Sequence, residues 1–498
     1  MNLLTISASI DDFFWGKVMI YLCLGAGVYF SFRMKFSQLR LIKDMLRELL
    51  GNKSSAQGVS SFQGFAMALG GRVGTGNITG VATAIYFGGP GAVFWMWAIA
   101  FLGAGSAFIE SSLAQVWKEE VHGEYRGGPA YYIEKGLKMK RLGAAFAVLT
   151  ILSCGILLPG IQSNSFAISA KNAFGIDPLI VAFIYTALLG YVILGGGKRI
   201  AKTAEMVVPF MAIAYILIAA VILLANYQRI IPMFTLIFTC AFNLNSVYGA
   251  VFGMAVSWGV KRGVFSNEAG QGTGAQAAGA AEVSHPAKQG LVQAFSVYVD
   301  TLLVCTATAI MILSTNTFNT ANPAGGFIAE YLPGVSKGDF TQTAVNTFMP
   351  GWGGAIVSIA LFFFTFTTVM AYAFYSDSNV AYLFRDKHHG KAYQRSLLIS
   401  RLVLLSMVFA GTLLSVDVVW NFGSAGVGAM AWFNILAILL LSKPGIATLT
   451  DFEKQKKMGL DPVFVPERIG IKNATLWHRI VAKSYVKQLN ALNKAERK

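Results

Sequence analysis

A glycine-rich string interrupts a long apolar stretch of the sequence. The stretch runs from about residue 62 to 87, and near its middle lies Gly70-Gly71-Arg72-Val73-Gly74-Thr75-Gly76-Asn77-Ile78-Thr79-Gly80. About 20 apolar residues are enough to cross a bilayer as a helix, but glycines spaced this closely favour a break in that helix. A break frees backbone groups that hydrocarbon cannot hydrogen-bond, so it is tolerated only where it lines a cavity or binds a ligand. Secondary transporters build their sites in this way, so the string indicates transport.

The composition is that of a polytopic membrane protein. The 498 residues are 55% hydrophobic and 13% charged, whereas soluble domains carry about 25% charged residues. The apolar runs predict about eleven transmembrane helices, near residues 13–33, 62–86, 91–116, 143–170, 178–196, 204–225, 247–281, 290–314, 351–382, 397–415 and 418–442. We therefore predict an all-α integral membrane protein, with one transmembrane domain over 1–442 and a basic tail over 443–498.

The basic residues predict an orientation. The formal net charge is +16, and Lys and Arg concentrate in residues 33–53, 135–141, 198–202 and 385–395 and in the tail after Lys443. All of these segments fall on one side when the predicted helices alternate across the membrane. The positive-inside rule makes that side cytoplasmic. We therefore expect a multi-pass protein of the plasma membrane, with the N-terminus outside and the C-terminus inside.

A second apolar stretch carries a similar interruption. It contains Gly263-Val264-Phe265-Ser266-Asn267-Glu268-Ala269-Gly270-Gln271-Gly272-Thr273-Gly274. Each interruption begins a block of five predicted helices, over about 62–225 and 247–442, while the helix near 13–33 lies outside both blocks. An odd number of helices separates the two starting points, so the second block enters from the opposite face. This arrangement predicts an inverted repeat with the binding site at the interface between its halves.

Further strings are distinctive over about residues 60–440. Besides the two interruptions they are Gly88-Gly89-Pro90-Gly91-Ala92-Val93-Phe94-Trp95-Met96-Trp97, Gly127-Gly128-Pro129-Ala130-Tyr131-Tyr132-Ile133 and Phe366-Thr367-Thr368. In this order the strings resemble the alanine or glycine:cation symporter family, the sodium:alanine symporters. The resemblance implies a leucine-transporter-like fold with one N-terminal helix and a five-plus-five inverted repeat. It also implies symport of alanine or glycine into the cell by alternating access, with sodium as the coupling ion and no other cofactor.

Polar groups at the two breaks form the predicted substrate site. An amino acid in an apolar site needs donors for its carboxylate and acceptors for its ammonium group, because either charge is expensive to leave bare. The backbone amides of Thr75 and Gly76, near the start of a half-helix, suit the carboxylate. The side chains expected to face the same cavity are those of Asn77, Gln162, Asn164, Ser266, Asn267 and Gln271. For Gln162 and Asn164, hydrogen bonding between helices is the alternative.

The family resemblance implies a sodium site. Its ligands would be the carbonyl oxygens of Gly70, Val73 and Phe364 and the hydroxyls of Thr367 and Thr368. Positions i, i+3 and i+4 share one face of a helix, so the three ligands from 364–368 can converge on one ion. The alternative is that both threonines bond back to carbonyls of their own helix.

Charged residues at membrane depth mark pathways or internal ion pairs. They are Arg72, Glu110, Glu205, Lys261, Arg262, Glu268, Asp300 and Asp377. We expect Arg72 to neutralise an acid of the second block, with Glu268 and Asp300 as the leading partners. Lys261 and Arg262 open the second break, where a hydrated vestibule is one explanation. For the remaining three acids, partial hydration near cytoplasmic helix ends is the simplest interpretation.

Other classes of function fit the sequence less well, and we predict that the chain is not an enzyme. A phosphate-binding loop needs a different glycine spacing, after a strand. No histidine falls at membrane depth, because all five lie in hydrophilic loops or the tail, where we expect them to be solvated: His122, His285, His388, His389 and His478. A passive channel and a symporter for another neutral amino acid such as glutamine remain alternatives, since polar broken helices also line pores. No nucleic-acid partner is expected; the predicted partners are the amino acid, sodium and the bilayer.

The tail contains one segment with a partly apolar side. Leu476, Trp477, Ile480 and Val481 recur at helical spacing among basic residues. A basic amphipathic helix of this kind would lie on the anionic inner leaflet, and an ordinary solvated tail is the alternative.

Overall fold

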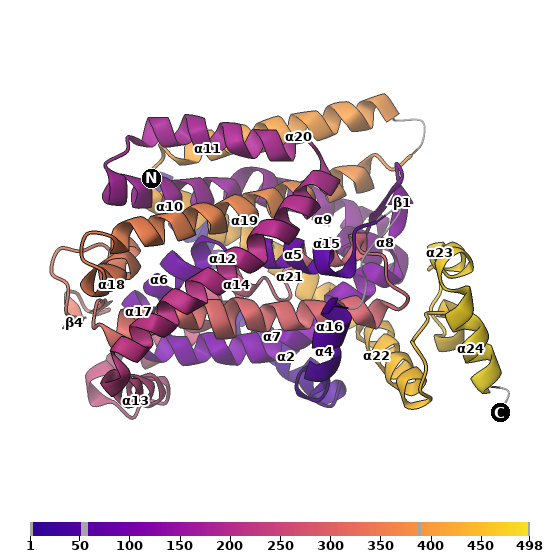
Figure 1. Cartoon of the computed structure of the whole chain (residues 1–498), viewed down its shortest axis with the longest axis horizontal. Coiled ribbons are helices and arrows are strands. Elements are labelled where there is room, and N and C mark those ends of the chain that lie inside the picture. Colours follow the sequence, from indigo (N-terminus) through magenta and orange to yellow (C-terminus); the bar gives the residue numbers. More distant parts are fainter. Residues whose placement is uncertain (1–2, 51–57, 387–389, 497–498) are drawn as a thin grey trace.

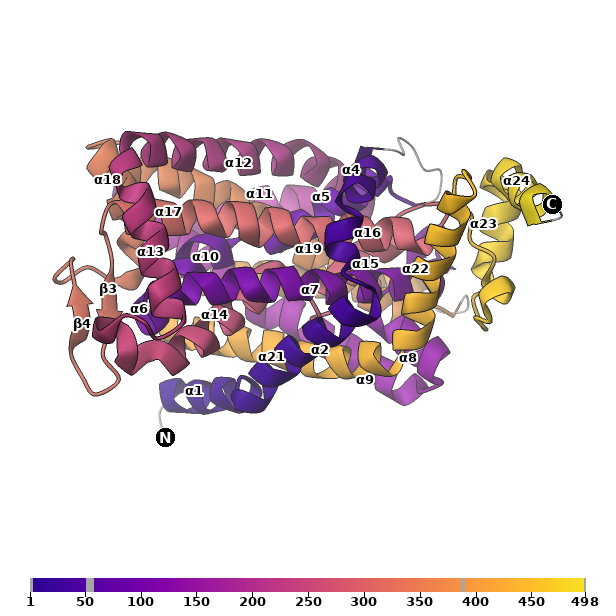
Figure 2. The ribbon, with the colours of Figure 1, turned by 90° about the horizontal axis from the view of Figure 1, so that it is seen from below.

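The structure of the chain, a computed structural model, describes residues 3–50, 58–386 and 390–496. It is an elongated bundle of helices that run roughly along its long axis (Figure 1). The N-terminus and the C-terminus lie toward opposite ends of that axis (Figure 2). Lys53, His388 and His389, which belong to the predicted hydrophilic loops, lie outside the described residues.

Eight helical stretches in the described part of the chain are long and apolar enough to cross a membrane. They are α1–α2 (Leu3–Phe14, Lys17–Arg33), α7 (Gly91–Val116), α9–α10 (Lys140–Leu152, Leu158–Phe174), α12 (Gly197–Ala225), α16–α17 (Pro286–Val297, Thr306–Ser314), α19 (Gly353–Leu383), α20 (Gly390–Gly411) and α21 (Val416–Leu440). The shorter α11 (Pro178–Ile193) is also apolar. Large apolar side chains of α12 such as Met206, Phe210 and Leu217 are exposed, as lipid-facing residues are. The prediction of an all-α integral membrane protein is confirmed.

Two further helices are broken, at the positions that the glycine strings predict. The first runs as α5 (Ser61–Arg72) and, after a gap, as a π-helical turn (Gly76–Gly80) that continues into α6 (Val81–Gly88). The second runs as α14 (Phe252–Asn267) and α15 (Thr273–Ala280). The 12 residues of α5 and the 16 of α14 are each shorter than a bilayer requires, so only the paired halves span the bundle.

The second broken helix packs closely against α7 at the centre of the bundle. A Cβ atom added at Gly259 would lie 2.5 Å from the carbonyl oxygen of Ala92, and one at Gly263 would lie 2.4 Å from Cγ2 of Ile99. Glycine at these two positions therefore lets the helices approach, as small residues do between membrane helices. The contact holds the residues before the second break in a fixed position.

The two ends of the bundle carry different secondary elements. One, here named the loop end, carries α13 (Ile230–Ala241), the antiparallel strands β3 (Asn319–Ala321) and β4 (Phe327–Glu330), and α18 (Phe340–Phe348). The other, here named the tail end, carries α3 (Ser37–Arg40), α4 (Ile42–Leu50), the antiparallel strands β1 (Glu119–Val121) and β2 (Glu124–Arg126), α8 (Pro129–Leu137), α22 (Ser442–Lys457), α23 (Leu476–Ser484) and α24 (Val486–Glu496). The described parts of the basic segments 33–53 and 135–141 and of the tail after Lys443 therefore lie together at the tail end.

The apolar face of the tail packs on the protein, so both predictions for it are wrong. Trp477 is fully buried, and its Nε1–H donates to the carbonyl oxygen of Gln115 near the end of α7 at 3.0 Å. Ile480 and Val481 are also buried. The end of α7 and the chain around residues 463–464 supply an apolar surface that this face of α23 covers.

Backbone hydrogen bonds join the two broken helices at the tail end. The amide of Val59, which precedes α5, donates to the carbonyl of Ala280 at 3.1 Å, and the amide of Glu282 donates to the carbonyl of Val59 at 3.0 Å.

The prediction that His285 is solvated is wrong. His285 is buried, and its ring lies 3.1 Å from the carboxylate of Asp451 on α22. It is buried because α22 covers the start of α16.

Candidate functional site

The first break presents backbone amides that polar side chains already satisfy. The amide of Gly74 donates to Oδ1 of Asn77 at 2.8 Å, and the amide of Thr75 donates to Oε1 of Gln162 on α10 at 3.1 Å. The hydroxyl of Thr75 is buried without a partner among the described residues. Gln162 therefore occupies the amide that we expect to meet a substrate carboxylate.

The second break turns through left-handed backbone. Glu268, Gly270 and Gly272 have φ of +55°, +82° and +88°, a region that glycine adopts without strain. The amide of Gly272 donates to Oε2 of Glu110 on α7 at 3.1 Å, and Asn434 of α21 donates to the same oxygen at 2.7 Å. Glu110 is therefore not partly hydrated, as we expected, but buried beside the break.

Asp300 joins the two breaks. It lies in a π-helical segment, Tyr298–Cys305, between α16 and α17. Its Oδ1 accepts a hydrogen bond from Nδ2 of Asn77 at 2.6 Å, and its Oδ2 accepts one from the hydroxyl of Ser266 at 2.9 Å and one from the hydroxyl of Thr301 at 2.7 Å. Two predicted site residues, Asn77 and Ser266, thus both donate to the carboxylate of Asp300.

The predicted ion pair of Arg72 is wrong. Its Nε donates to the carbonyl oxygen of Asn267 at 2.6 Å, and its Nη1 donates to Oε1 of Gln293 at 3.0 Å and to the hydroxyl of Ser296. Within the described chain no carboxylate oxygen lies within 4.0 Å of this guanidinium. Neutral groups of α14 and α16 take its hydrogen bonds, while the charge interacts at longer range with three buried acids, Glu110, Glu268 and Asp300.

The residues expected to bind sodium lie together. The hydroxyl of Thr368 lies 2.9 Å from the carbonyl oxygen of Gly70, 3.2 Å from that of Val73 and 2.9 Å from that of Phe364. The hydroxyl of Thr367 lies 3.1 Å from the same Phe364 oxygen and 3.0 Å from that of Phe363. Both threonines thus bond back to carbonyls of their own helix, as the alternative states, and Thr368 alone also contacts the first break. A cluster of uncharged oxygens where a helix breaks is the chemistry that sodium requires.

The remaining predicted residues lie apart from these contacts or only partly share them. Asn267 donates from Nδ2 to the hydroxyl of Thr301 at 3.3 Å, and the side chain of Gln271 is buried. Asn164 donates to the carbonyl oxygens of Gly411 and Leu414, both at 2.9 Å. Its amide hydrogens therefore bond between helices, as the alternative for this residue states.

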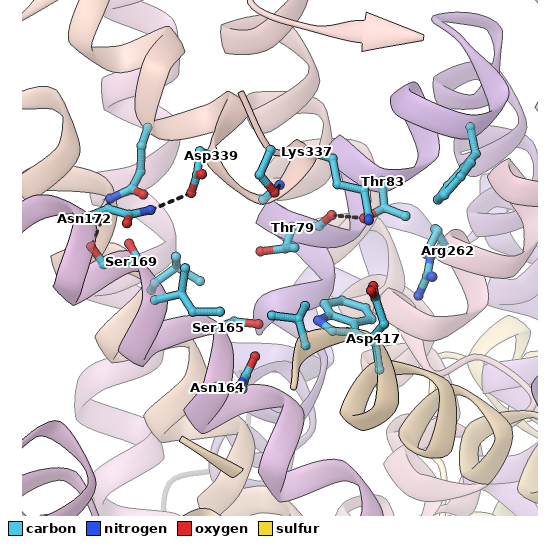
Figure 3. A pocket seen from close by; sticks show the side chains of 18 of the residues that line it. Thr79, Thr83, Asn164, Ser165, Ser169, Asn172, Arg262, Lys337, Asp339 and Asp417 are labelled. Carbon is cyan, nitrogen blue, oxygen red and sulfur yellow. Dashed lines mark hydrogen bonds between the residues drawn. The ribbon is translucent and has the colours of Figure 1, made fainter. Parts of the chain in front are cut away.

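A cavity of about 320 Å³ opens at the loop end (Figure 3). Its walls come from α6, α10, α14, α21 and the segment before α18, and they include Thr79, Thr83, Asn164, Ser165, Trp258, Arg262, Lys337, Asp339, Asp417 and Trp420. The ring of Trp420 stacks on that of Phe265, with centroids 5.4 Å apart. A Cβ atom added at Gly76 would lie 3.2 Å from Cδ1 of Phe265, so this ring packs directly against the first break.

A family model for the sodium:alanine symporter family matches residues 1–466. The chain belongs to the sodium:alanine symporter family. A relative from Bacillus sp. (strain PS3), named sodium/proton-dependent alanine carrier protein, is 49% identical to this family member, over 87% of the chain and 97% of the relative. One from Bacillus subtilis (strain 168), named "Probable sodium/glutamine symporter GlnT", is 41% identical over 91% of each chain.

A solved structure supports the fold of this symporter-family chain. It is the substrate-bound outward-open state of a Na+-coupled sialic acid symporter, with a TM-score of 0.50 and 15% sequence identity, covering 95% of this chain and 97% of that one. The likeness concerns the fold alone. The family assignment is thus confirmed, and the likeness over nearly the whole chain supports a helical transporter fold.

Proposed function

We propose that this chain is a sodium-coupled symporter that carries a small neutral amino acid, alanine or glycine, into the cell by alternating access. The observation that carries the proposal is the meeting of the Thr368 hydroxyl with the carbonyl oxygens of Gly70, Val73 and Phe364. These oxygens belong to two helices that would move relative to each other, so an ion between them couples its own binding to the position of the first break.

The substrate site in this proposal lies between the two breaks. The carboxylate binds the amides of Thr75 and Gly76 after Gln162 releases the Thr75 amide, because a charged acceptor forms the stronger hydrogen bond. Asn77, Ser266, Asn267 and Gln271 line the remaining space. We assign Asn164 to the wall of the cavity at the loop end, since its amide hydrogens are engaged by Gly411 and Leu414.

The orientation follows from the charges. With the basic segments on the cytoplasmic side of the plasma membrane, the loop end faces the outside and the tail end the cytoplasm. The cavity then opens to the outside, and the backbone bonds of Val59 with Ala280 and Glu282 close the cytoplasmic side. During transport the outer cavity would close and the cytoplasmic side would open. The repeats, about 62–225 and 247–442, would move against each other to do this.

The experiment that tests this proposal compares alanine with glutamine, because a relative at 41% identity is named a probable sodium/glutamine symporter. Counterflow would be measured with purified protein in liposomes loaded with one unlabelled amino acid and supplied outside with labelled alanine or, in a parallel series, with labelled glutamine. We expect alanine or glycine inside to drive labelled alanine uptake in sodium, and glutamine inside to drive little. Counterflow with glutamine and none with alanine would identify glutamine as the substrate in place of alanine. No counterflow with any neutral amino acid would refute the proposed function.

A further inference from the structure

Another cavity, here named the basic pocket, lies at the tail end beside the end of α2 and the start of α22. Its volume is about 400 Å³. Its basic residues come from α2, from α22 and from the short 3₁₀ turn Pro466–Ile469, and they are Arg33, Lys443, Lys454 and Arg468. Two acids, Asp451 and Glu496, also line it. The pocket shares no residue with the sites proposed for the amino acid and for sodium.

Both acids of the basic pocket already have partners. The carboxylate of Glu496 lies 2.6 Å from Nη1 of Arg468. That of Asp451 lies 3.1 Å from the ring of His285 and accepts a hydrogen bond from Nε2 of Gln455 at 2.9 Å. Arg468 and the two acids therefore need no further ligand, and the remaining charge of the pocket is positive.

The other three cations have no acidic partner. Over the ranges that the structure describes, no carboxylate oxygen lies within 4.0 Å of Arg33, Lys443 or Lys454. Cζ of Arg33 lies 5.7 Å from the ring centroid of Tyr29, whose hydroxyl donates to that of Ser442 at 3.3 Å. This contact holds the end of α2 against the start of α22. Like charges gathered around one cavity repel one another, and an anion between them would relieve that repulsion.

The basic pocket lies where membrane helices end. Arg33 is the last residue of the stretch α1–α2, and Lys443 lies in the first turn of α22, directly after α21. Figure 2 shows α22 lying across the long axis of the bundle rather than along it, as a helix at the membrane surface does. The last turns of α2 and α21 expose large apolar side chains, those of Val28, Phe32, Leu436 and Leu440. Cations and lipid-facing side chains therefore meet at this edge, which the proposed orientation places at the inner leaflet.

We propose that the basic pocket binds the headgroup of an anionic phospholipid of the inner leaflet. The phosphate lies between the guanidinium of Arg33 and the ammonium groups of Lys443 and Lys454, because a guanidinium matches phosphate oxygens in two parallel hydrogen bonds and each lysine adds a point charge. The acyl chains lie along the exposed apolar side chains of α2 and α21. Basic pockets beside the cytoplasmic ends of membrane helices suit such headgroups. The inference goes beyond symport and rests only on the orientation in the proposed function.

A lipid in the basic pocket would also stabilise the tail end. α22 lines the pocket and, through Asp451, contacts His285 at the start of α16. A ligand that binds only the folded chain stabilises it, and does so more as its concentration rises above Kd. Adding the lipid should therefore raise the melting temperature of the wild type.

The test is binding of phosphatidylglycerol to the purified full chain in detergent, followed by native mass spectrometry over a series of lipid concentrations. Phosphatidylcholine, which has no net charge, should bind the wild type far more weakly. Each cation near the headgroup contributes about fivefold in affinity, so Arg33→Gln/Lys443→Gln/Lys454→Gln should bind phosphatidylglycerol about 100-fold more weakly. The lipid should raise the melting temperature of the wild type and not that of the triple variant. Lys454→Gln alone, a change at an exposed position, should weaken binding about fivefold, which keeps the test decisive if the triple variant does not fold.

A matched control removes the same charge elsewhere at the tail end. Lys138→Gln/Lys140→Gln/Arg141→Gln changes exposed residues outside the pocket wall, and it should bind phosphatidylglycerol as the wild type does. An equal loss in this control would indicate diffuse attraction by surface charge and overturn the proposal. So would equal binding of phosphatidylcholine, which would indicate a site for acyl chains alone.

Competition distinguishes the lipid from a free anion. Millimolar inorganic phosphate or glycerol phosphate should leave the bound phosphatidylglycerol in place, because neither carries acyl chains. Complete displacement by either would assign the pocket to a soluble phosphate and overturn the lipid site, as would the absence of tight phosphatidylglycerol binding to the wild type. The binding measurement contains no transport step, so its failure would leave the proposed symport standing, and failure of counterflow would leave the lipid site standing.

Discussion

Replacing Thr368 by valine tests the sodium site at the atom where its proposed ligands meet. Valine nearly preserves the shape of threonine and removes the hydroxyl that lies 2.9 Å from the carbonyl oxygens of Gly70 and Phe364 and 3.2 Å from that of Val73. Those carbonyls remain, so the site would lose one oxygen of its set. Hydrogen bonds to charged groups are worth about 1.5–3 kcal/mol, and we take this range for a hydroxyl bound to sodium. At about 1.4 kcal/mol per tenfold change, affinity should fall about 10- to 100-fold.

The assay is alanine uptake into proteoliposomes over a series of sodium concentrations. Thr368→Val should raise the sodium concentration for half-maximal uptake by that factor, with normal insertion in the membrane. Thr365→Val is the matched control: it removes a buried hydroxyl of the same helix that bonds to Leu361 and Tyr185 instead. Unchanged sodium dependence in Thr368→Val, or an equal shift in Thr365→Val, would refute the assignment.

Three further outcomes follow from buried groups. Arg72→Met leaves nearby acids uncompensated, so it should lower the melting temperature more than Arg72→Met/Glu268→Gln does; a double variant no more stable than the single would contradict this. Trp477→Ala should cost about 3–5 kcal/mol of stability, with Trp477→Phe losing less, as thermal unfolding in detergent would show; equal melting temperatures for wild type and Trp477→Ala would place the tail in solvent. Burial lowers the pKa of His285 despite its contact with Asp451, so the unfolded chain binds the extra proton and stability should fall as pH drops below about 6.5. A His285→Gln variant with the same pH dependence as the wild type would contradict that cause.

Local signals in the sequence predicted the helix breaks. A glycine cluster inside an apolar run is explained by a break in a membrane helix. Both breaks lie at the positions that these clusters predicted. The family resemblance then singled out Gly70, Val73 and Phe364, and the fold brings them to the Thr368 hydroxyl. Spacing alone cannot pair residues almost 300 positions apart, so this part of the site depended on the resemblance.

The long-range contacts could not be predicted from the sequence. The partners of Arg72 on α16 are more than 200 positions away, and Gln293 and Ser296 carry no pattern that distinguishes them from other polar residues of a membrane helix. Trp477 looked like part of a surface helix because its partner, the carbonyl of Gln115, is a backbone atom at the end of α7. In both cases tertiary packing determines the neighbour, and helical periodicity gives only the face.

The central claim, that a sodium gradient drives uptake of a small neutral amino acid, has one direct measurement. Proteoliposomes with an inward sodium gradient and no proton gradient should accumulate labelled alanine or glycine above its external concentration. Collapse of the gradient by a sodium ionophore should release the accumulated excess. Uptake that stops at equal concentrations inside and outside, whatever the sodium gradient, would contradict the account and identify a passive channel.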